Sequence, residues 1–141
     1  MESLLYEVGI VTGFEAAHRL HGDFGPAQRL HGHTYRVEIT VQGEHVRKDG
    51  TLCDIAVLQE AAGELMAELH YRNLDELPAF AEKNSTAEAV ARHLFDALSP
   101  VLVGVELSTL TVRVWESPSA WAGYSGPLAA RFVPPSRSPA S

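Results

Sequence analysis

The chain has 141 residues and a mass of 15.3 kDa, which is the size of one domain of ordinary length. Lys and Arg number 11 and Asp and Glu number 18, so the net charge is −7, which argues against phosphate-backbone binding and hence against a nucleic-acid partner. A content of 45% hydrophobic and 21% charged residues is typical of globular proteins and excludes wholesale disorder.

The single cysteine, Cys53, cannot form an internal disulfide bond, which favours a reducing compartment, the cytoplasm. The start, MESLLYEV, has no basic region followed by a long apolar run, so we expect no signal peptide. No apolar stretch is long enough to span a bilayer, and we expect no membrane partner. We expect one domain over residues 1–133 and a flexible tail, rich in Pro and Ser, over residues 134–141.

Two strands are expected in the first third of the chain. Residues 4–19 are predicted to form the first, with a break near Gly13. From Thr34 to Gln42, apolar and polar residues alternate with the period of a half-buried strand. A loop around Gly50 follows it.

Two helices are expected in the middle of the chain. Asp54 is the predicted N-cap of the first, whose apolar residues recur at helical spacing and which ends before Asn73. The second is predicted to open at Ser85, because Ser85-Thr86-Ala87-Glu88 has the spacing of a capping box, and to end before Pro100.

The last part of the chain predicts a strand over residues 109–116 and a strand or extended segment over residues 120–132. The order is therefore strand, strand, helix, helix, strand, strand. This order favours an α+β domain with an antiparallel sheet and both helices on one face. Such a sheet has exposed edges, which pairing between subunits commonly covers.

Histidines are the most informative residues. His31 and His33 point to the same face of an extended chain, and a hairpin between the first two strands would bring His18 beside them. Three imidazoles leave a fourth position open on a tetrahedral ion, as in a catalytic zinc site. The alternative is that His-x-His is a surface accident. His45 and His93 are expected to be solvated.

Two glutamates have two readings each. Glu116 has the parity of the apolar residues of its strand, so it points either to the buried face, where it would accept hydrogen bonds from a ligand, or to solvent if the strand has ended. Glu88 belongs either to the capping box or to a ligand site. Cys53 is expected to be a small buried apolar residue rather than a reactive thiolate.

Five short motifs occur in a specific joint order. They are Phe14-Glu15-Ala16-Ala17-His18, Leu30-His31-Gly32-His33-Thr34-Tyr35, Gly50-Thr51-Leu52-Cys53-Asp54, Ser85-Thr86-Ala87-Glu88 and Val112-Arg113-Val114-Trp115-Glu116. Together they resemble the 6-pyruvoyl-tetrahydropterin synthase and 6-carboxytetrahydropterin synthase family. The resemblance runs from about residue 6 to residue 124, nearly the whole chain.

The resemblance implies the tunnelling fold, in which each subunit carries a four-stranded antiparallel sheet with two helices on one side. It implies that subunits join edge to edge into a trimeric barrel and that two trimers stack into a homo-hexamer. The family's substrates are pterins with a triphosphorylated side chain, typically 7,8-dihydroneopterin triphosphate. In the family, zinc holds the side-chain oxygens and acidifies the neighbouring C–H, while a base moves protons and triphosphate leaves.

The resemblance also assigns site residues. It implies that Zn²⁺ is the cofactor, that Glu116 anchors the pterin ring, and that Thr86 and Glu88 lie near the same pocket. The implied zinc ligands are His18, His31 and His33.

The chain departs from the family pattern at the catalytic base. The family has a cysteine a few residues before His-Gly-His, and Ala27 takes its place here. An ungapped match puts His70 and Tyr71 where the family has its Asp-His pair; a shift by one residue restores His70 as the catalytic histidine but spoils the match that follows. His70 is the best candidate base by intrinsic pKa, Tyr71 by position, and Asp23 is a third.

Two hypotheses follow. The first is a zinc-dependent pterin lyase with an altered catalytic base, which cleaves the side chain of its pterin or acts on a different pterin. The second is a non-catalytic pterin-binding hexamer, a carrier or regulator. Pathways of queuosine, biopterin and folate type all remain open.

Overall fold

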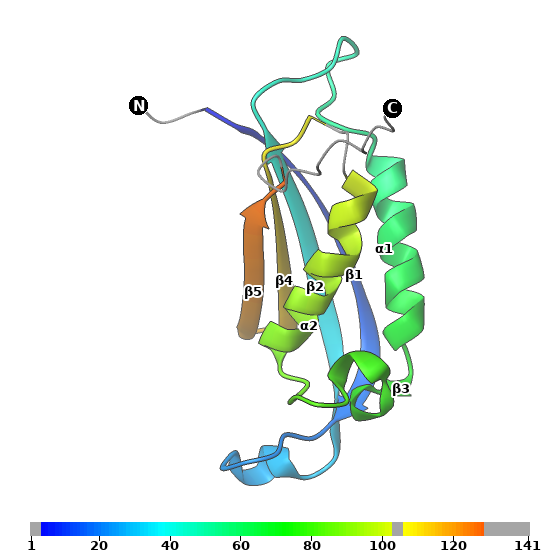
Figure 1. The fold of residues 1–141 in the computed structure, drawn as a ribbon, viewed down its shortest axis with the longest axis vertical. Coiled ribbons are helices and arrows are strands. Elements are labelled where there is room, and N and C mark those ends of the chain that lie inside the picture. The colour runs from blue at the N-terminus through cyan, green and yellow to red at the C-terminus, as the bar shows by residue number, and fades with distance from the viewer. Residues whose placement is uncertain (1–3, 103–105, 129–141) are drawn as a thin grey trace, which may run out of the picture.

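The computed structural model describes residues 4–102 and 106–128, so the predicted tail lies outside the described residues. Five strands form one sheet in the order β3-β1-β2-β4-β5, and two α-helices cover it (Figure 1). The strands are β1 (Tyr6–His18), β2 (His31–Gly43), β3 (Arg72–Asn73), β4 (Thr109–Ser117) and β5 (Ala120–Pro127). The helices are α1 (Ile55–Leu69) and α2 (Ala87–Leu98).

The α+β class, the antiparallel core of the sheet and the placement of both helices on one face are as predicted. The sheet differs in one respect, because it has five strands rather than four. The additional strand, β3, is two residues long and pairs in parallel with Ala16 and Ala17 of β1. The chain reaches β1 there because it turns sharply after α1, and Tyr71 has a positive φ of 59° at that turn.

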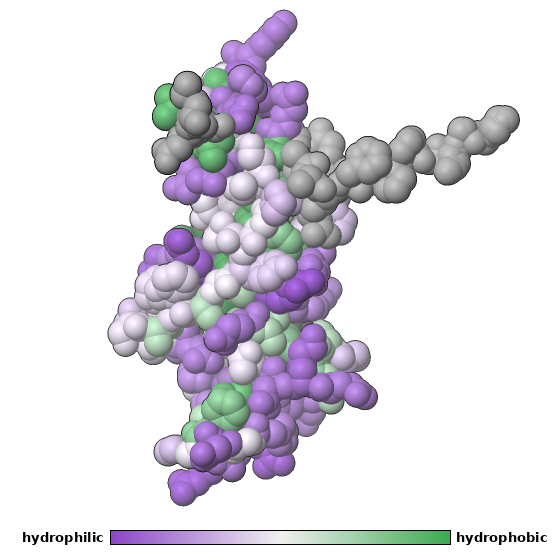
Figure 2. Space-filling view, turned by 60° about the vertical axis from the view of Figure 1, so that its left-hand side comes forward, coloured by the Kyte–Doolittle hydropathy of each residue, from purple (hydrophilic) through white to green (hydrophobic). Residues whose placement is uncertain are grey.

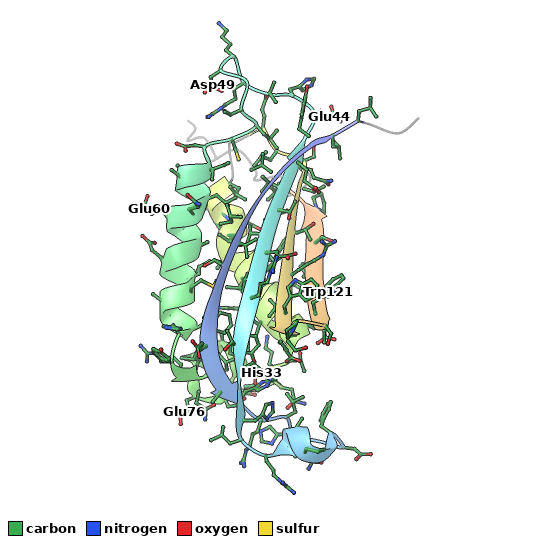
Figure 3. The ribbon with its side chains drawn as sticks, turned by 180° about the vertical axis from the view of Figure 1, so that it is seen from behind. His33, Glu44, Asp49, Glu60, Glu76 and Trp121 are labelled. Carbon is green, nitrogen blue, oxygen red and sulfur yellow. The ribbon has the colours of Figure 1, made fainter. Side chains whose placement is uncertain are left out.

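The hydrophobic core lies between the sheet and the helices. α1 packs against β1, whereas α2 packs against β4 and β5. The apolar positions that alternate along β2 and β4 face the helices, and Ile39, Leu110 and Val112 are fully buried there. From behind, no helix lies in front of the sheet, and the labelled His33 lies near the end opposite Glu44 and Asp49 (Figure 3).

β1 is continuous, so the predicted break near Gly13 is wrong. Each residue of β1 from Tyr6 to His18 pairs in unbroken register with β2. Gly13 is needed for a different reason, because a Cβ atom at this position would collide with the carbonyl oxygen of Tyr35 on the neighbouring strand. The glycine therefore permits close approach of two backbones rather than a bend.

Helix caps were predicted correctly in one case and shifted in the other. Asp54 caps α1, since its side chain accepts a hydrogen bond from the Ala56 N–H at 3.0 Å. The N-cap of α2 is Thr86, which accepts from the Ala89 N–H at 3.1 Å, and not Ser85. Glu88 is therefore one residue too close to the cap for the predicted capping box.

The visible face in Figure 2 is mainly hydrophilic, with hydrophobic areas that are small and scattered. In residues 4–102 and 106–128, no helix is both long and apolar enough to cross a bilayer. Cys53 is buried, and burial raises the pKa of its thiol, which agrees with the predicted structural role.

Candidate metal and pterin site

Three histidines from two strands meet at one end of the sheet. His18 ends β1 and is paired directly with His31, the first residue of β2, and His33 follows two residues later on the same face. The ring centroid of His18 lies 4.6 Å from that of His31 and 5.1 Å from that of His33. One nitrogen from each ring lies within 4.8 Å of the other two, so the three can reach a common ion.

Hydrogen bonds fix two of these rings. The Nδ1 atom of His18 lies 2.8 Å from the carbonyl oxygen of Ser85, and that of His31 lies 2.7 Å from the carbonyl oxygen of Arg29. A carbonyl only accepts, so each Nδ1 carries the proton and each Nε2 keeps its lone pair. His18 is 1% exposed, and its Nε2 has no hydrogen-bond partner among the described residues.

The third ring, His33, is suited to the same role. Burial lowers the pKa of His33, while the charge of Glu116 opposes that shift. The lowered pKa keeps the imidazole neutral at pH 7, the form that binds a metal. A buried nitrogen without a partner and a set of three neutral imidazoles fit a zinc ion that keeps one open position.

Glu116 lies on the helix-facing side of the sheet near the histidines. It sits in the last turn of the ladder of β4, where the pairing with β5 shifts between Trp115 and Ser117. Its side chain is half-buried, so of the two readings the structure shows the inward one, with partial access to solvent. Its charge acts on both His33 and Tyr35, which places a carboxylate beside the three-histidine cluster.

Tyr35 was not singled out in the sequence, although it belongs to the same motif as His31 and His33. Its side chain is 1% exposed, and its hydroxyl has no partner among the described residues. Burial raises the pKa of Tyr35, and the carboxylates of Glu116 and Asp75 raise it further. The phenol therefore stays protonated and can only act as a donor toward a ligand.

Thr86 and Glu88 stand at the start of α2. The Thr86 side chain is half-buried and holds the helix cap, whereas Glu88 is exposed. Ser85, immediately before them, contacts His18, which ties the start of α2 to the histidine cluster. Of the remaining histidines, His45 is exposed as predicted, but His93 is half-buried against Phe80 and was wrongly predicted to be solvated.

His70 and Tyr71 lie at the outer edge of β1. The Glu15 N–H donates to Nδ1 of His70 at 3.0 Å, and the Tyr71 N–H donates to the Glu15 carbonyl at 2.6 Å. The lone pair of His70 Nδ1 is thus already used by the backbone. Tyr71 stacks on His70 with ring centroids 3.9 Å apart and is 78% exposed, so its hydroxyl is accessible.

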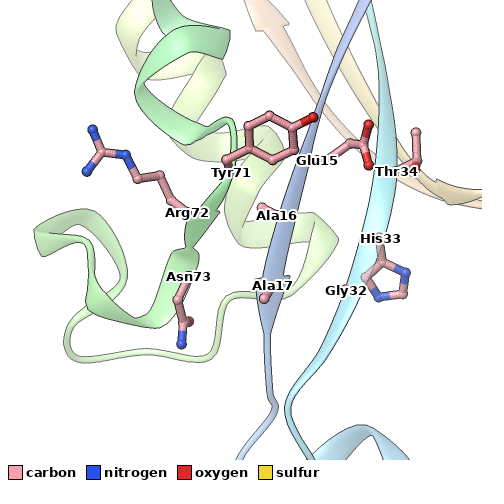
Figure 4. A pocket seen from close by; sticks show the side chains of 9 residues that line it. All are labelled: Glu15, Ala16, Ala17, Gly32, His33, Thr34, Tyr71, Arg72 and Asn73. Carbon is pink, nitrogen blue, oxygen red and sulfur yellow. The ribbon is translucent and has the colours of Figure 1, made fainter.

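A cavity of about 540 Å³ joins this edge to the start of β2. Its lining includes Glu15, Tyr71, Thr34 and His33. In Figure 4 the Tyr71 ring turns back toward β1 and Glu15, while the Arg72 side chain points away from both strands. The cavity thus links the predicted proton-transfer pair with one of the three histidines.

Comparison with known proteins follows the same direction. The profile of the family described as 6-pyruvoyl tetrahydropterin synthase matches residues 7–127. This chain belongs to that family. The pterin synthase of Drosophila melanogaster, "6-pyruvoyl tetrahydrobiopterin synthase", is 35% identical over 128 residues, covering 81% of this chain and 76% of the fly protein.

Two further relatives show the breadth of the family. The "6-carboxy-5,6,7,8-tetrahydropterin synthase" of Haemophilus influenzae is 24% identical over 142 residues, covering 85% of this chain and 99% of that protein. The solved structure of Caenorhabditis elegans 6-pyruvoyl tetrahydropterin synthase superposes with a TM-score of 0.76 at 28% identity. The alignment covers 89% of this chain and 99% of the nematode protein, so the tunnelling-fold subunit accounts for nearly all of both.

Proposed function

We propose that this tetrahydropterin synthase homologue is a zinc-dependent lyase that acts on 7,8-dihydroneopterin triphosphate or a related reduced pterin. The observation that carries the proposal is the buried Nε2 of His18, which has no protein partner in the described part of the chain and shares a small space with nitrogens of His31 and His33. Such a nitrogen is costly to bury unless an ion or a ligand completes it.

In this proposal His18, His31 and His33 hold the ion, which when bound supplies a Lewis acid for oxygens of the pterin side chain. Glu116 accepts hydrogen bonds from the N–H groups of the pterin ring and so fixes its orientation. Thr86 and Glu88, at the start of α2, line the same site.

Proton transfer is the step in which this chain departs from its family. Ala27, in the loop between β1 and β2, has no group that can take a proton. The usual elimination removes a proton from carbon and breaks the C–O bond to triphosphate, so another base is required. The Nδ1 of His70 is occupied by the Glu15 N–H, which leaves Tyr71 as the accessible proton-transfer group of the pair. Because an ordinary tyrosine is a better acid than base, we propose an altered reaction, such as cleavage of the side chain.

The proposed assembly is a homo-hexamer in the cytoplasm, and the single buried cysteine is compatible with that compartment. β1 pairs with β3 over two residues only, and β5 ends the sheet on the other side. Both edges therefore offer backbone groups for pairing between subunits. Light scattering that gives a single-subunit mass would contradict this assembly.

A product assay tests the function. Zinc-loaded protein is mixed with 7,8-dihydroneopterin triphosphate, and the pterins are resolved by mass spectrometry. Loss of triphosphate or of side-chain carbons establishes a lyase, and Tyr71→Phe, compared with His70→Ala, then identifies the proton-transfer group. Binding without turnover across a panel of reduced pterins would favour the alternative, a non-catalytic pterin-binding carrier or regulator.

A further inference from the structure

We propose that Asp75 and Ser85 are positioning residues that hold the buried His18 ring in its ligand orientation. The inference rests on the proposed function, because it concerns the same three-histidine site. Neither residue is a metal ligand in the proposed site. They act instead from the connection between α1 and α2, a segment remote in sequence from both histidine strands.

The contacts form a chain that starts at a carboxylate. The Ser85 hydroxyl donates to Oδ1 of Asp75 at 2.7 Å, in a partly buried position. Ser85 is itself fully buried, and its Oγ lies 3.2 Å from Nδ1 of His18. Its carbonyl oxygen accepts the His18 Nδ1 proton at 2.8 Å. Asp75 thus fixes the Ser85 side chain, and Ser85 fixes the tautomer and the plane of the His18 ring.

The second oxygen of Asp75 ties the same unit to the end of β1. Oδ2 accepts the backbone N–H of Arg19, the residue after His18, at 2.9 Å. One residue before Ser85, the Asn84 side chain accepts from the His21 N–H and donates to the His21 carbonyl, both at 2.8 Å. The chain on the C-terminal side of His18 is therefore held at Arg19 and at His21, and the ring is held at Nδ1.

This arrangement matters because a histidine ligand must present one nitrogen at a fixed angle. A hydrogen-bonded partner on the other ring nitrogen fixes the tautomer and raises the basicity of the ligand, and loss of such partners typically lowers metal affinity by about 10- to 100-fold. His18 is the most buried of the three histidines, so it has the fewest alternative orientations. Its hydrogen-bond partners should accordingly influence the site strongly.

The test measures Zn²⁺ affinity of the full chain by competition with a chromophoric chelator. The variants are Ser85→Ala and Asp75→Asn, and the matched control is Ser99→Ala. Ser99 is also buried and its hydroxyl also donates a hydrogen bond, to the Phe95 carbonyl at 2.8 Å, but at the opposite end of α2. The thermal midpoint of the metal-free proteins reports on folding, and the visible spectrum of the Co²⁺ forms reports on ligand geometry.

We expect Ser85→Ala and Asp75→Asn each to weaken Zn²⁺ binding by about 10-fold or more and to alter the Co²⁺ spectrum. Ser99→Ala should lower the thermal midpoint but leave both metal readouts at the wild-type value. If Asp75→Asn fails to fold, Ser85→Ala decides. Wild-type affinity and spectrum in Ser85→Ala would overturn the inference while leaving the zinc site intact. A wild-type protein that does not bind Zn²⁺ would overturn the proposed metal site and the inference with it.

Discussion

Tyr35 places a hydroxyl in the protein interior without a partner in the described part of the chain. Its ring stacks on Phe14 with centroids 4.6 Å apart, so the aromatic part is well packed while the polar atom is not satisfied. An unpaired buried hydroxyl costs about 1–3 kcal/mol, and such groups concentrate at sites that bind ligands. The side chain therefore has one structural half and one half that the folded subunit alone leaves unused.

Tyr35→Phe should leave the stability of the metal-free protein unchanged or increase it, because only the unpaired hydroxyl is lost. Tyr35→Leu is the control, since it loses the stacking contact with Phe14 and should cost more than about 1 kcal/mol. Urea unfolding measures both. A Tyr35→Phe protein that is as unstable as Tyr35→Leu would mean that the hydroxyl already has a partner in the folded subunit.

Two glycines in regular elements have opposite expected effects when replaced by alanine. Gly13→Ala should destabilise the protein by about 1–3 kcal/mol, because its Cβ would overlap the Tyr35 carbonyl oxygen and force β1 away from β2. Gly63→Ala should stabilise it by about 0.5–1 kcal/mol, because Gly63 lies inside α1 with open space around its Cα. Chemical denaturation of the two variants beside the wild type tests this contrast, and equal effects would contradict it.

Elements with a long periodic pattern were predictable. The alternation in β2 and the apolar stripe of α1 follow from the need to bury one face of a strand or of a helix. β3 was missed because two residues carry no pattern. The cap of α2 was shifted because Ser85 and Thr86 are both good N-caps by type, and only the contact of Ser85 with His18 excludes it from that role.

The histidine cluster was predictable because two of its members are near neighbours and the third is brought by a hairpin. Its supporting residues were not. Ser85 lies 67 positions from His18, and Asp75 lies 56 positions from Arg19, so no local spacing connects them. The side of β1 on which His70 and Tyr71 lie was likewise hidden, because it depends on the turn at Tyr71 and on β3.

At the scale of the whole molecule, a bound ion should stabilise the folded state by mass action. Zn²⁺ at about 100 times its Kd adds about 2.7 kcal/mol, which corresponds to a rise in Tm of roughly 5–10 °C for a domain of this size. Differential scanning calorimetry of metal-free protein with and without Zn²⁺ measures the rise. His31→Ala should abolish most of it, and a rise in that variant equal to the wild-type rise would contradict the assignment of the ion to these histidines.

The loop between β1 and β2 begins after His18 and ends before His31, and these two residues form the last pair of the hairpin ladder. Its short 3₁₀ helix, Gly25–Gln28, contains no buried residue and includes Ala27. Insertions or replacements in this loop are therefore tolerated without displacing either histidine, since the ladder keeps its ends together. Natural selection can exchange the acid–base chemistry beside a constant set of metal ligands, which makes this hairpin a ready source of new reactions.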